Sequence, residues 1–321
     1  MALINVGVLR GGPSNEYEVS LQTGGVVLRH LDTNKYKPHD IFIDKEGVWH
    51  MGGTPRQPEN ILSQVDVLFN ALHGEYGEDG RIQQLLESHG ARYTGSDALG
   101  SALGMNKALA KQIFKDHGIK TAHYTVISDA SNLHQTAVEL FRKFPMPAVV
   151  KPLASGSSVG VTIAKDFHSL EAGLRHAFQF GDAVIVEEFI PGIEATCGVI
   201  EGYRDHDLYA LPPVEIRPHG DRFFDYEAKY QGKSEEICPG NFDHDTKAMI
   251  EHLAKAAHKA LGLRHYSRSD FIVSPRRGVY ILEVNTLPGL TEESLFPKSL
   301  NAVGSNLSHF FDHLIELALQ K

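Results

Sequence analysis

The sequence is short of cysteine, of long apolar runs and of positive charge. Cys197 and Cys238 are the two cysteines in 321 residues, too few for a disulfide framework, which favours a reducing compartment. No segment reaches the ~18 apolar residues of a membrane span, and the N-terminus lacks the features of a signal peptide. The formal net charge of −9 argues against a general nucleic-acid binder, because such proteins hold phosphate backbones with Lys and Arg. We therefore expect a cytoplasmic protein without membrane or nucleic-acid partners.

Three common ligand-binding motifs are also missing. The eighteen histidines show neither zincin nor zinc-finger spacing, so they do not indicate a zinc centre. The glycine turn after the first apolar run lacks the complete Gly-x-Gly-x-x-Gly fingerprint of dinucleotide-binding proteins. The small-residue segment 154–160 lacks the Gly-Lys-Ser/Thr ending of a P-loop, and no helix follows it immediately. A nucleotide, if bound, must be held in another way.

The composition is that of an ordinary globular protein, with 42% hydrophobic and 22% charged residues. Apolar runs at 3–9, 39–43 and 65–72 alternate with helical patterns at 16–31 and 80–89. This alternation is typical of a parallel sheet with covering helices, so residues 1–97 are predicted to form a Rossmann-like domain.

Ligands of such sheets gather beyond the carboxyl ends of the strands. Glu16 follows the first predicted strand and His73 follows the strand at 65–72, which makes both residues candidates for binding. A purely structural role for each stays open.

The remaining chain predicts two α+β units. Helices are expected at 106–117, 133–144, 243–261 and 307–317, and strands at 124–127, 147–151, 183–189, 195–201 and 208–216. A Pro-Gly turn at 191–192 offers a hinge, so a boundary is placed near residue 188. The predicted fold class is α/β, with domains at 1–97, 98–187 and 188–321.

A predicted hairpin in the last domain carries the most chemical information. Counting outwards from a loop at 275–278 places Asp270 opposite Glu283, and Arg268 opposite Asn285. Facing carboxylates only ~5 Å apart destabilise a sheet unless a cation compensates them. Carboxylate and amide oxygens suit Mg²⁺, which typically binds one or two carboxylates together with substrate phosphates. The alternative, a solvated face on which Arg268 neutralises the acids, stays open.

Upstream features suit a nucleotide triphosphate. Lys151 ends an apolar strand, where an ammonium group is costly to bury without an anion, and with Lys107 it can neutralise phosphates. The segment 154–160 offers backbone N–H groups and serine hydroxyls for phosphate oxygens. Glu187 and Glu188 end the next apolar strand, where they can hold an adenine amine and a ribose, with a solvated strand end as the equal alternative.

The longest irregular segment, 218–240, has the length of an active-site lid. Such a lid would bring Lys229 and Tyr230 to a reacting phosphoryl group. Together with the hairpin and the lysines, it indicates a phosphoryl-transfer enzyme that binds Mg²⁺ and a nucleotide.

Along nearly its whole length, the chain resembles the D-alanine:D-alanine ligases of the ATP-grasp superfamily. The ATP-grasp fold has an N-terminal Rossmann-like parallel-sheet domain and two α+β domains that enclose the ATP cleft. The motifs that carry the resemblance occur in the family's order: Gly11-Gly-Pro-Ser-Asn-Glu16-Tyr-Glu-Val-Ser20, Ala71-Leu-His73-Gly-Glu-Tyr-Gly-Glu78-Asp-Gly80, Lys151-Pro with Gly156-Ser157-Ser158-Val-Gly160, Asp225-Tyr-Glu-Ala-Lys-Tyr230, and Glu283-Val-Asn285-Thr-Leu-Pro-Gly289-Leu-Thr291.

The resemblance implies roles for individual residues. Two Mg²⁺ or Mn²⁺ ions would be held by Asp270, Glu283 and Asn285. The ATP cleft would be lined by Lys107, Lys151, Ser157, Ser158, Glu187, Glu188, Ile190, Glu194 and Lys229. Glu16 would bind the ammonium of the first D-alanine, with His73 nearby, and Ser294 and Leu295 would bind the carboxylate of the second. Arg268 and the Gly289 N–H would form the oxyanion site. The catalytic residues Glu16, Ser157 and Tyr230 would form a hydrogen-bond network that closes the site.

The implied reaction joins two D-alanine molecules through an acyl phosphate, with release of ADP and phosphate, and supplies a peptidoglycan precursor. The implied partners are ATP and D-alanine, the family tendency favours a homodimer, and dependence on a monovalent cation is left open. Two other functions stay open: ligation of D-alanine to D-lactate or D-serine, and a silent nucleotide-binding protein. The Lys229-Tyr230 pair favours D-alanine as second substrate.

Three positions depart from the common family pattern. Arg10 stands where an uncharged residue is usual, Tyr17 where a basic residue is usual, and Ala154-Ser155 where a charged pair often precedes the loop. These departures bear on substrate preference and on contacts of the ATP loop.

Overall fold

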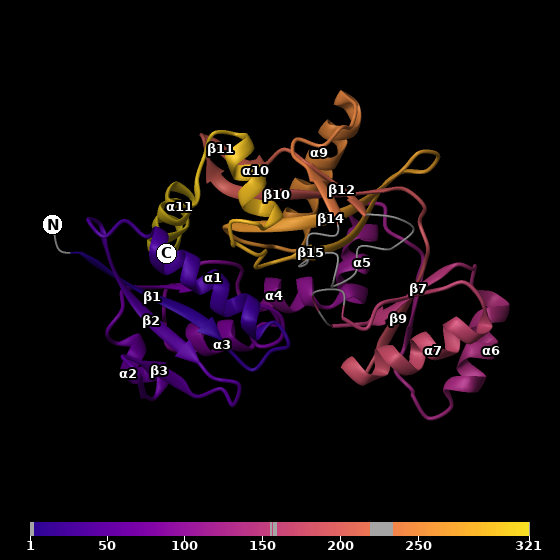
Figure 1. Ribbon diagram of the computed structural model, residues 1–321, viewed down its shortest axis with the longest axis horizontal. Coiled ribbons are helices and arrows are strands. Elements are labelled where there is room, and N and C mark those ends of the chain that lie inside the picture. The colour runs from indigo at the N-terminus through magenta and orange to yellow at the C-terminus, as the bar shows by residue number, and fades with distance from the viewer. Residues whose placement is uncertain (1–2, 155, 157–158, 219–233, 321) are drawn as a thin grey trace.

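A computed structural model describes residues 3–154, 156, 159–218 and 234–320 of the chain. Within these residues, three β-sheets organise the molecule, and Figure 1 shows them as an indigo lobe, a rose lobe and an orange lobe. Four of the predicted site residues lie outside the described residues, namely Ser157, Ser158, Lys229 and Tyr230.

The first sheet contains the predicted parallel strands. Its strand order is β4-β3-β2-β1-β5, and β1 pairs in parallel with both β2 and β5. Because β1 and β5 are neighbouring parallel strands, Glu16 beyond β1 and His73 beyond β5 lie at the same edge of the sheet. Its elements are β1 (Ile4–Gly11), α1 (Tyr17–His30), β2 (Tyr36–Ile43), β3 (Trp49–Met51), β4 (Thr54–Pro55), α2 (Pro58–Leu62), β5 (Val67–Asn70) and α3 (Arg81–Ser88).

The second sheet has the order β6-β9-β7-β8 and is antiparallel throughout. Helices α6 and α7 supply an apolar face, including Leu140, Leu170 and Leu174, that packs against the sheet. The segment 154–160 joins β7 to β8. The elements are β6 (Tyr124–Ile127), α6 (Leu133–Lys143), β7 (Ala148–Pro152), β8 (Thr162–Ala164), α7 (Phe167–Ala177), the 3₁₀ helix Phe178–Phe180 and β9 (Val184–Glu188).

The third sheet has the order β13-β12-β10-β14-β15, with β11 paired to β10. The single strand predicted at 208–216 is wrong, because β11 and β12 are separate strands. Two consecutive prolines, Pro212 and Pro213, lie between them and cannot donate to a strand ladder. The elements are β10 (Ile193–Tyr203), β11 (His206–Ala210), β12 (Val214–Pro218), β13 (Ser234–Ile237), α9 (His244–Ala260), β14 (Tyr266–Ser274), β15 (Gly278–Asn285), α10 (Leu295–Ala302) and α11 (Leu307–Leu319).

The β14–β15 hairpin has the predicted pairing at its functional end, although its turn differs. The predicted loop was one residue too long, because Ser274 pairs with Gly278. A bulge at Leu282 takes up the one-residue difference, since Phe271 pairs with Ile281 and Asp270 with Glu283. The expected pairs Asp270 with Glu283 and Arg268 with Asn285 are therefore confirmed.

Helices α4 (Ala98–Met105) and α5 (Lys107–Asp116) connect the first two sheets along the chain. Asn106 caps α5 by accepting from the N–H groups of Ala108 and Leu109, and Gly118 follows the helix with φ 72°. Phe114 of α5 belongs to the apolar core under the third sheet. The helix thus brings Lys107 from the second predicted domain to the face of the third sheet.

The largest apolar core among the described residues joins both ends of the chain. Val8 and Phe69 of the first sheet pack with Phe310 and Phe311 of α11, and the rings of Phe69 and Phe311 lie 5.1 Å apart. Figure 1 accordingly shows α11 beside α1. The division into domains at 97 and 187 remains a proposal, with the gap between β9 and β10 at the predicted hinge.

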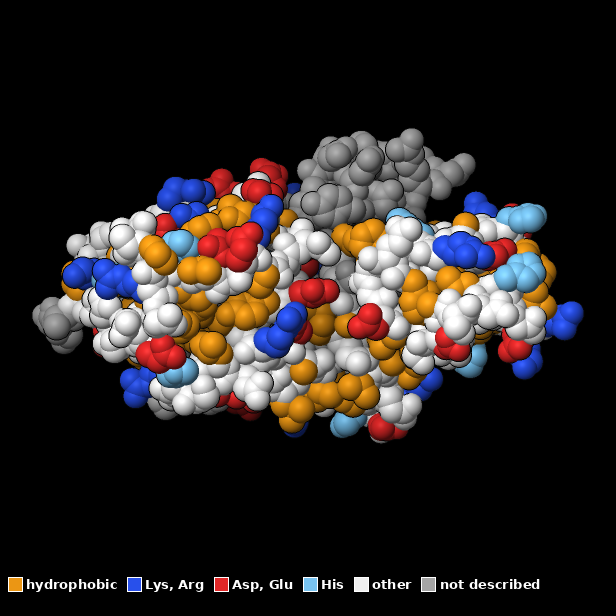
Figure 2. All heavy atoms as spheres, turned by 90° about the horizontal axis from the view of Figure 1, so that it is seen from below, with side chains coloured by type: hydrophobic (Ala, Val, Ile, Leu, Met, Phe, Trp, Pro, Cys, Tyr) orange, Lys and Arg blue, Asp and Glu red, His pale blue; other side chains and the backbone are white. Residues whose placement is uncertain are grey.

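The surface carries mixed charge. On the face seen in Figure 2, acidic and basic side chains are interspersed among apolar ones. No helix in the described part of the chain combines the length and apolar character that crossing a membrane requires.

Candidate active site

A cavity of about 540 Å³ lies where the three sheets meet. Its walls come from α1, the loop after β5, α5, β7, β9, β10 and the β14–β15 hairpin. All the predicted site residues that fall in the described ranges line it: Glu16, His73, Lys107, Lys151, Glu187, Glu188, Ile190, Glu194, Arg268, Asp270, Glu283, Asn285, Gly289, Ser294 and Leu295.

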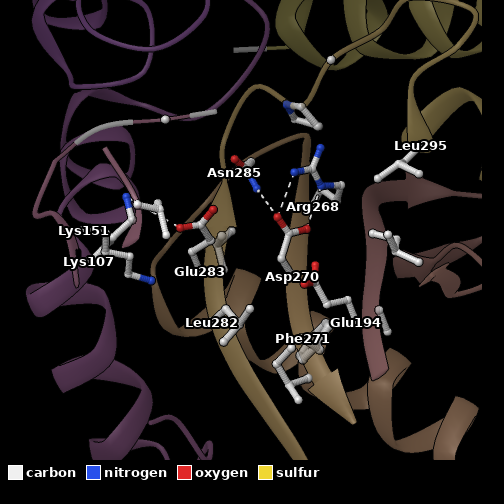
Figure 3. A pocket seen from close by; sticks show the side chains of 18 of the residues that line it. Lys107, Lys151, Glu194, Arg268, Asp270, Phe271, Leu282, Glu283, Asn285 and Leu295 are labelled. Atoms are coloured by element: carbon white, nitrogen blue, oxygen red, sulfur yellow. Dashed lines mark hydrogen bonds and ion pairs between the residues drawn. The ribbon is translucent and has the colours of Figure 1, made fainter. Parts of the chain in front are cut away.

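Asp270 lies at the centre of a polar cluster on the hairpin (Figure 3). Arg268 donates to both of its carboxylate oxygens, from Nε at 2.8 Å and from Nη2 at 2.9 Å. The Asn285 amide donates to Asp270 Oδ2 at 3.1 Å, and the Thr196 hydroxyl donates to Oδ1 at 2.7 Å. Arg268 therefore pairs with Asp270, as the alternative interpretation of the hairpin expects for the acids.

Glu283 is compensated from a different element. Its Oε2 atom lies 3.6 Å from the Lys107 ammonium of α5, and Figure 3 shows its side chain turned toward Lys107 and Lys151. The two facing carboxylates are thus compensated by different cations, Asp270 by Arg268 and Glu283 by Lys107.

The hairpin residues fit a hard divalent cation. Asn285 uses its nitrogen to donate to Asp270, which leaves its carbonyl oxygen as the atom that a cation would use. Two carboxylates and one amide oxygen form a donor set typical of Mg²⁺. Among the described residues, no group of three or more His, Cys, Asp or Glu side chains could hold a metal ion, so a cation here would also need substrate oxygens or water.

A buried charge cluster lies beneath the opposite wall. Glu187 of β9 is 2% exposed, and its Oε1 atom lies 3.0 Å from Lys151 Nζ and 3.2 Å from Lys111 Nζ. Burial opposes the ionised form of Glu187, but the two ammonium groups lower its pKa below the usual value. Burial likewise opposes the charge on Lys151, but Glu187 and Glu283 raise its pKa.

Lys111 is a buried residue of the site that was not predicted, although the sequence carries a signal for it. The buried positions of α5 are Lys107, Ala110, Lys111 and Phe114, which follow the i, i+3, i+4, i+7 spacing of a helix face turned inward. A lysine on such a face needs a buried anion, which only the folded structure identifies as Glu187.

Glu188 lies at the rim of the cavity. Its carboxylate accepts from the guanidinium of Arg277 at 3.2 Å and from the His123 N–H at 3.0 Å. Burial opposes the charge, but Arg277 and the His123 N–H lower the pKa of Glu188. The Glu188 side chain is therefore held by Arg277 at the hairpin tip, and Phe189 and Ile190 continue the cavity wall.

The carboxylate of Glu16 reaches the loops that follow β5 and β7. A methyl group built on Gly74 would lie 2.6 Å from Glu16 Oε2, and one built on Gly156 would collide with the same oxygen. A side chain at either position would therefore require the Glu16 carboxylate to move. Glu16 therefore comes close to the segment 154–160 at Gly156. The predicted network of Glu16 with Ser157 and Tyr230 stays a prediction, because both partners lie outside the described residues.

His73 is buried in the cavity wall. Its Nε2 atom lies 2.8 Å from the Thr23 hydroxyl, and its Nδ1 atom lies 3.9 Å from Glu78 Oε1. The ring is thereby fixed between α1 and the loop after β5.

Glu78 is a second residue to which the sequence analysis gave no role. Its Oε1 atom accepts from the Gly74 N–H at 3.0 Å, and its Oε2 atom accepts from the Leu287 N–H at 3.0 Å and from the Thr286 hydroxyl at 3.3 Å. One carboxylate thus joins the loop after β5 to the segment leading to Gly289.

Ser294 stands at the N-terminus of α10. Its hydroxyl bonds to the Thr291 hydroxyl at 2.7 Å and does not cap the helix. The Ser294 side chain therefore leaves the N-terminus of α10 uncapped, and such a helix end favours an anion, for example a carboxylate. Gly289 lies beside Ser294, since a methyl group built there would be 2.9 Å from Ser294 Oγ.

Two of the family departures lie outside the cavity wall. Arg10 donates from Nε and Nη2 to the Asp40 carboxylate, both at 2.6 Å, and Tyr17 packs edge-on against Phe42 under the Lys45 ammonium. Both side chains stabilise contacts of the first sheet instead of lining the site.

Comparisons with known proteins agree along the whole chain. Family profiles described as "D-ala D-ala ligase N-terminus" and "D-ala D-ala ligase C-terminus" match residues 5–61 with 51–96, and residues 113–316. The D-alanine--D-alanine ligase of Desulfotalea psychrophila is 41% identical over 99% of this chain and 96% of its own length. That of Geobacter sulfurreducens is 41% identical over 91% of this chain and 87% of its own length.

Solved structures give the same answer for the fold. The D-alanine--D-alanine ligase of Bacillus anthracis complexed with ATP aligns with a TM-score of 0.81 and 32% identity, covering 99% of this chain and 98% of that one. The VanG D-Ala:D-Ser ligase of Enterococcus faecalis aligns with a TM-score of 0.85 and 31% identity, covering 99% and 100%. The motifs, the cavity and these matches agree, and the chain belongs to the D-alanine--D-alanine ligase family.

Proposed function

We propose that this protein joins two D-alanine molecules into D-alanyl-D-alanine at the expense of ATP, as a step in peptidoglycan synthesis. One observation carries the proposal: a single cavity brings together Glu16, which suits an ammonium group, the Asp270–Glu283 carboxylate pair and the lysines at its wall. These charges suit a reaction in which a substrate carboxylate is phosphorylated and then attacked by the amine of a second substrate.

The reaction would proceed in two steps. A carboxylate oxygen of the first D-alanine attacks the γ-phosphorus of ATP, the bond to the β-phosphate oxygen breaks, and an acyl phosphate and ADP form. The amine of the second D-alanine then attacks the acyl carbon, and the tetrahedral intermediate expels phosphate while the nitrogen gives up a proton. Catalysis of this kind rests mainly on positioning and on electrostatic stabilisation.

The side chains of the cavity would divide these tasks. Glu16 would hold the ammonium of the first D-alanine beside His73. Arg268 and the Gly289 N–H would stabilise the oxyanion of the tetrahedral intermediate, as preorganised donors do in other acyl transfers. The α10 N-terminus at Ser294 and Leu295 would receive the carboxylate of the second D-alanine.

The nucleotide would lie between the lysines and β9. Lys107 and Lys151 would neutralise its phosphates, and Glu187, Glu188, Ile190 and Glu194 would surround the adenosine. Divalent ions, Mg²⁺ or Mn²⁺, would be held by Asp270, Glu283 and Asn285 and would neutralise charge on the phosphates. From the resemblance alone, Ser157, Ser158, Lys229 and Tyr230 would complete the site on closure.

The test is ADP release by the purified protein with ATP and Mg²⁺, in the presence and absence of D-alanine, with the product identified by mass spectrometry. D-alanine-dependent ADP release together with the dipeptide is expected. ATP binding without ADP release or dipeptide would contradict the ligase and would leave a silent nucleotide-binding protein.

The acceptor needs its own measurement, because the VanG D-Ala:D-Ser ligase shares this fold at 31% identity. Reactions with mixtures of D-alanine and D-serine, or D-alanine and D-lactate, at several pH values should give D-alanyl-D-alanine as the main product. A predominant mixed product would reassign the second substrate. Light scattering would test the homodimer, which we keep as a prediction together with the cytoplasmic location and the open question of a monovalent cation.

A further inference from the structure

Lys111 is a buried cation that the roles described above do not use. It lies on α5 one turn after Lys107, and its side chain is 0% exposed. It does not line the cavity, whereas both Lys107 and Lys151 do. A fully buried ammonium group is costly unless it is paired, so its position needs an explanation.

The contacts of Lys111 connect three elements. Its ammonium lies 3.2 Å from Glu187 Oε1 on β9 and donates to the Thr121 hydroxyl at 2.8 Å. Thr121 in turn donates to the carbonyl oxygen of Ile281 on β15, at 3.0 Å. Lys111 therefore contacts β9 directly through Glu187, and it is linked to β15, the strand of Glu283, through the Thr121 hydroxyl.

Charge balance gives this arrangement a consequence for the cavity. One carboxylate oxygen, Glu187 Oε1, faces two ammonium groups at similar distances, 3.0 Å for Lys151 and 3.2 Å for Lys111. The three side chains together carry a net charge of about +1, in surroundings where charges are weakly screened. Of the two lysines, Lys151 lines the cavity and Lys111 does not. The excess positive charge of the group therefore faces the cavity through Lys151.

We propose that Lys111 is a positioning residue for the nucleotide phosphates: by sharing Glu187, it keeps that carboxylate from neutralising Lys151, whose charge then acts in the cavity. The inference rests on the proposed function only in that the cavity takes a nucleotide triphosphate. Burial lowers the pKa of Lys111 to about 8, which agrees with an ammonium group retained by a shared carboxylate.

The test is binding of ATP, inorganic tripolyphosphate and adenosine by calorimetry, without D-alanine. In K111M the side-chain length is kept and the charge is lost, so the Kd for ATP and tripolyphosphate should rise about tenfold. The Kd for adenosine should change less than twofold, because adenosine carries no charge and a change in the net charge at Lys151 acts on the phosphates. The matched control is K115M, which makes the same change at an exposed position of the same helix.

A second variant separates charge from packing. In K111M/E187Q, both the cation and the anion are removed, so Lys151 alone restores the net charge, and tripolyphosphate binding should return to within about threefold of wild type. Should K111M not fold, K111Q, whose amide can still donate to Glu187, carries the same expectation.

Two results with folded K111M would overturn the role of Lys111: equal weakening of tripolyphosphate and adenosine binding, or a change of no more than about twofold in the Kd values of both ligands. Failure of tripolyphosphate binding to recover in the double variant would also overturn it. The ligase proposal fails separately, if wild-type protein binds ATP but releases no D-alanine-dependent ADP.

Discussion

Single residues in this site are compensated before any substrate arrives. Arg268 binds Asp270 through two hydrogen bonds, and Lys107 lies 3.6 Å from Glu283. In the proposed function a cation and phosphates would share these partners, so removing one carboxylate should change metal use more than folding.

The first prediction concerns Glu283. Glu283→Gln keeps the size of the side chain but removes one negative charge from the proposed cation site, so kcat should fall about 100-fold or more. ADP release measured against Mg²⁺ concentration checks this, with circular dichroism to confirm folding. The control is Glu139→Gln on the exposed face of α6. Near-normal turnover at ordinary Mg²⁺ concentrations would refute the assignment of Glu283.

A second prediction concerns His265, which is 5% exposed and has φ 61°. Its Nδ1 atom accepts from the Gly95 N–H at 3.0 Å, and burial, followed by the Arg264 guanidinium, lowers its pKa from 6.5 to about 4. An unfolded chain takes up this proton below pH 6.5, whereas the folded chain resists until about pH 4. The stabilisation is therefore present above pH 6.5 and is lost as the pH falls to 4, by at most about 3 kcal/mol.

His265→Asn is the variant that isolates this effect. Asparagine tolerates a positive φ and can accept from Gly95, but it does not titrate. The free energy of unfolding, measured by urea at pH 4.5 and pH 7, should depend less on pH in His265→Asn than in wild type. Equal pH dependence in the two proteins would exclude His265 as the source.

Among the elements, the loop from β7 to β8 depends on close approach to Glu16. Gly156→Ala would drive a methyl group into the Glu16 carboxylate, so one of the two must move. Turnover should fall at least about tenfold, because displacement of a positioning group by about 1 Å is costly in catalysis. The melting temperature should change little, since Gly156 belongs to neither neighbouring apolar core.

The matched control for this third prediction is Gly181→Ala. A methyl group there would meet only ordinary contacts, at 3.8 Å from the Ala183 carbonyl oxygen. Unchanged kcat/KM for D-alanine in Gly156→Ala, with the control also unchanged, would show that Glu16 does not need this approach.

The β14–β15 hairpin shows how an element reaches its functional register. A turn one residue shorter than expected would by itself have placed Leu282 opposite Asp270, with an apolar side chain where the carboxylate is needed. The bulge at Leu282 corrects the pairing and places Glu283 opposite Asp270. Bulges are common where a strand must aim a side chain at a site.

Across the whole molecule, the cavity depends on packing between segments far apart in the sequence. Phe311 of α11 lies fully buried against Phe69 of β5 and Phe310, in the core that also holds β1 and α1. The helix that begins beside Glu16 is therefore held in part by the last helix of the chain.

The fourth prediction follows from this core. Phe311→Ala should lower the free energy of unfolding by about 3–5 kcal/mol, because it leaves a cavity at a fully buried position. Chemical denaturation measures this, with the exposed Phe141→Ala as control. A decrease in the free energy of unfolding below about 1 kcal/mol would mean that the packing of α11 against the first sheet contributes little to stability.

The sequence by itself determined the types of element, the α/β class and the pairing of Asp270 with Glu283. These depend on periodicity, on turn residues and on motifs, which act over short stretches of chain. It missed the break at Pro212-Pro213, where a continuous apolar run concealed two residues without N–H donors. It also set the hairpin loop one residue too long, because nothing in the local pattern marks Leu282 as a bulge.

Only the tertiary structure decided which charges meet. Lys111 and Glu187 lie on different elements, and Glu78 reaches Leu287 across more than two hundred residues of sequence. Such contacts depend on how sheets and helices pack, because a side chain reaches only a few ångströms while the chain between the partners is long. The physical environment of each ionisable group, and therefore its charge and its role, was fixed by that packing.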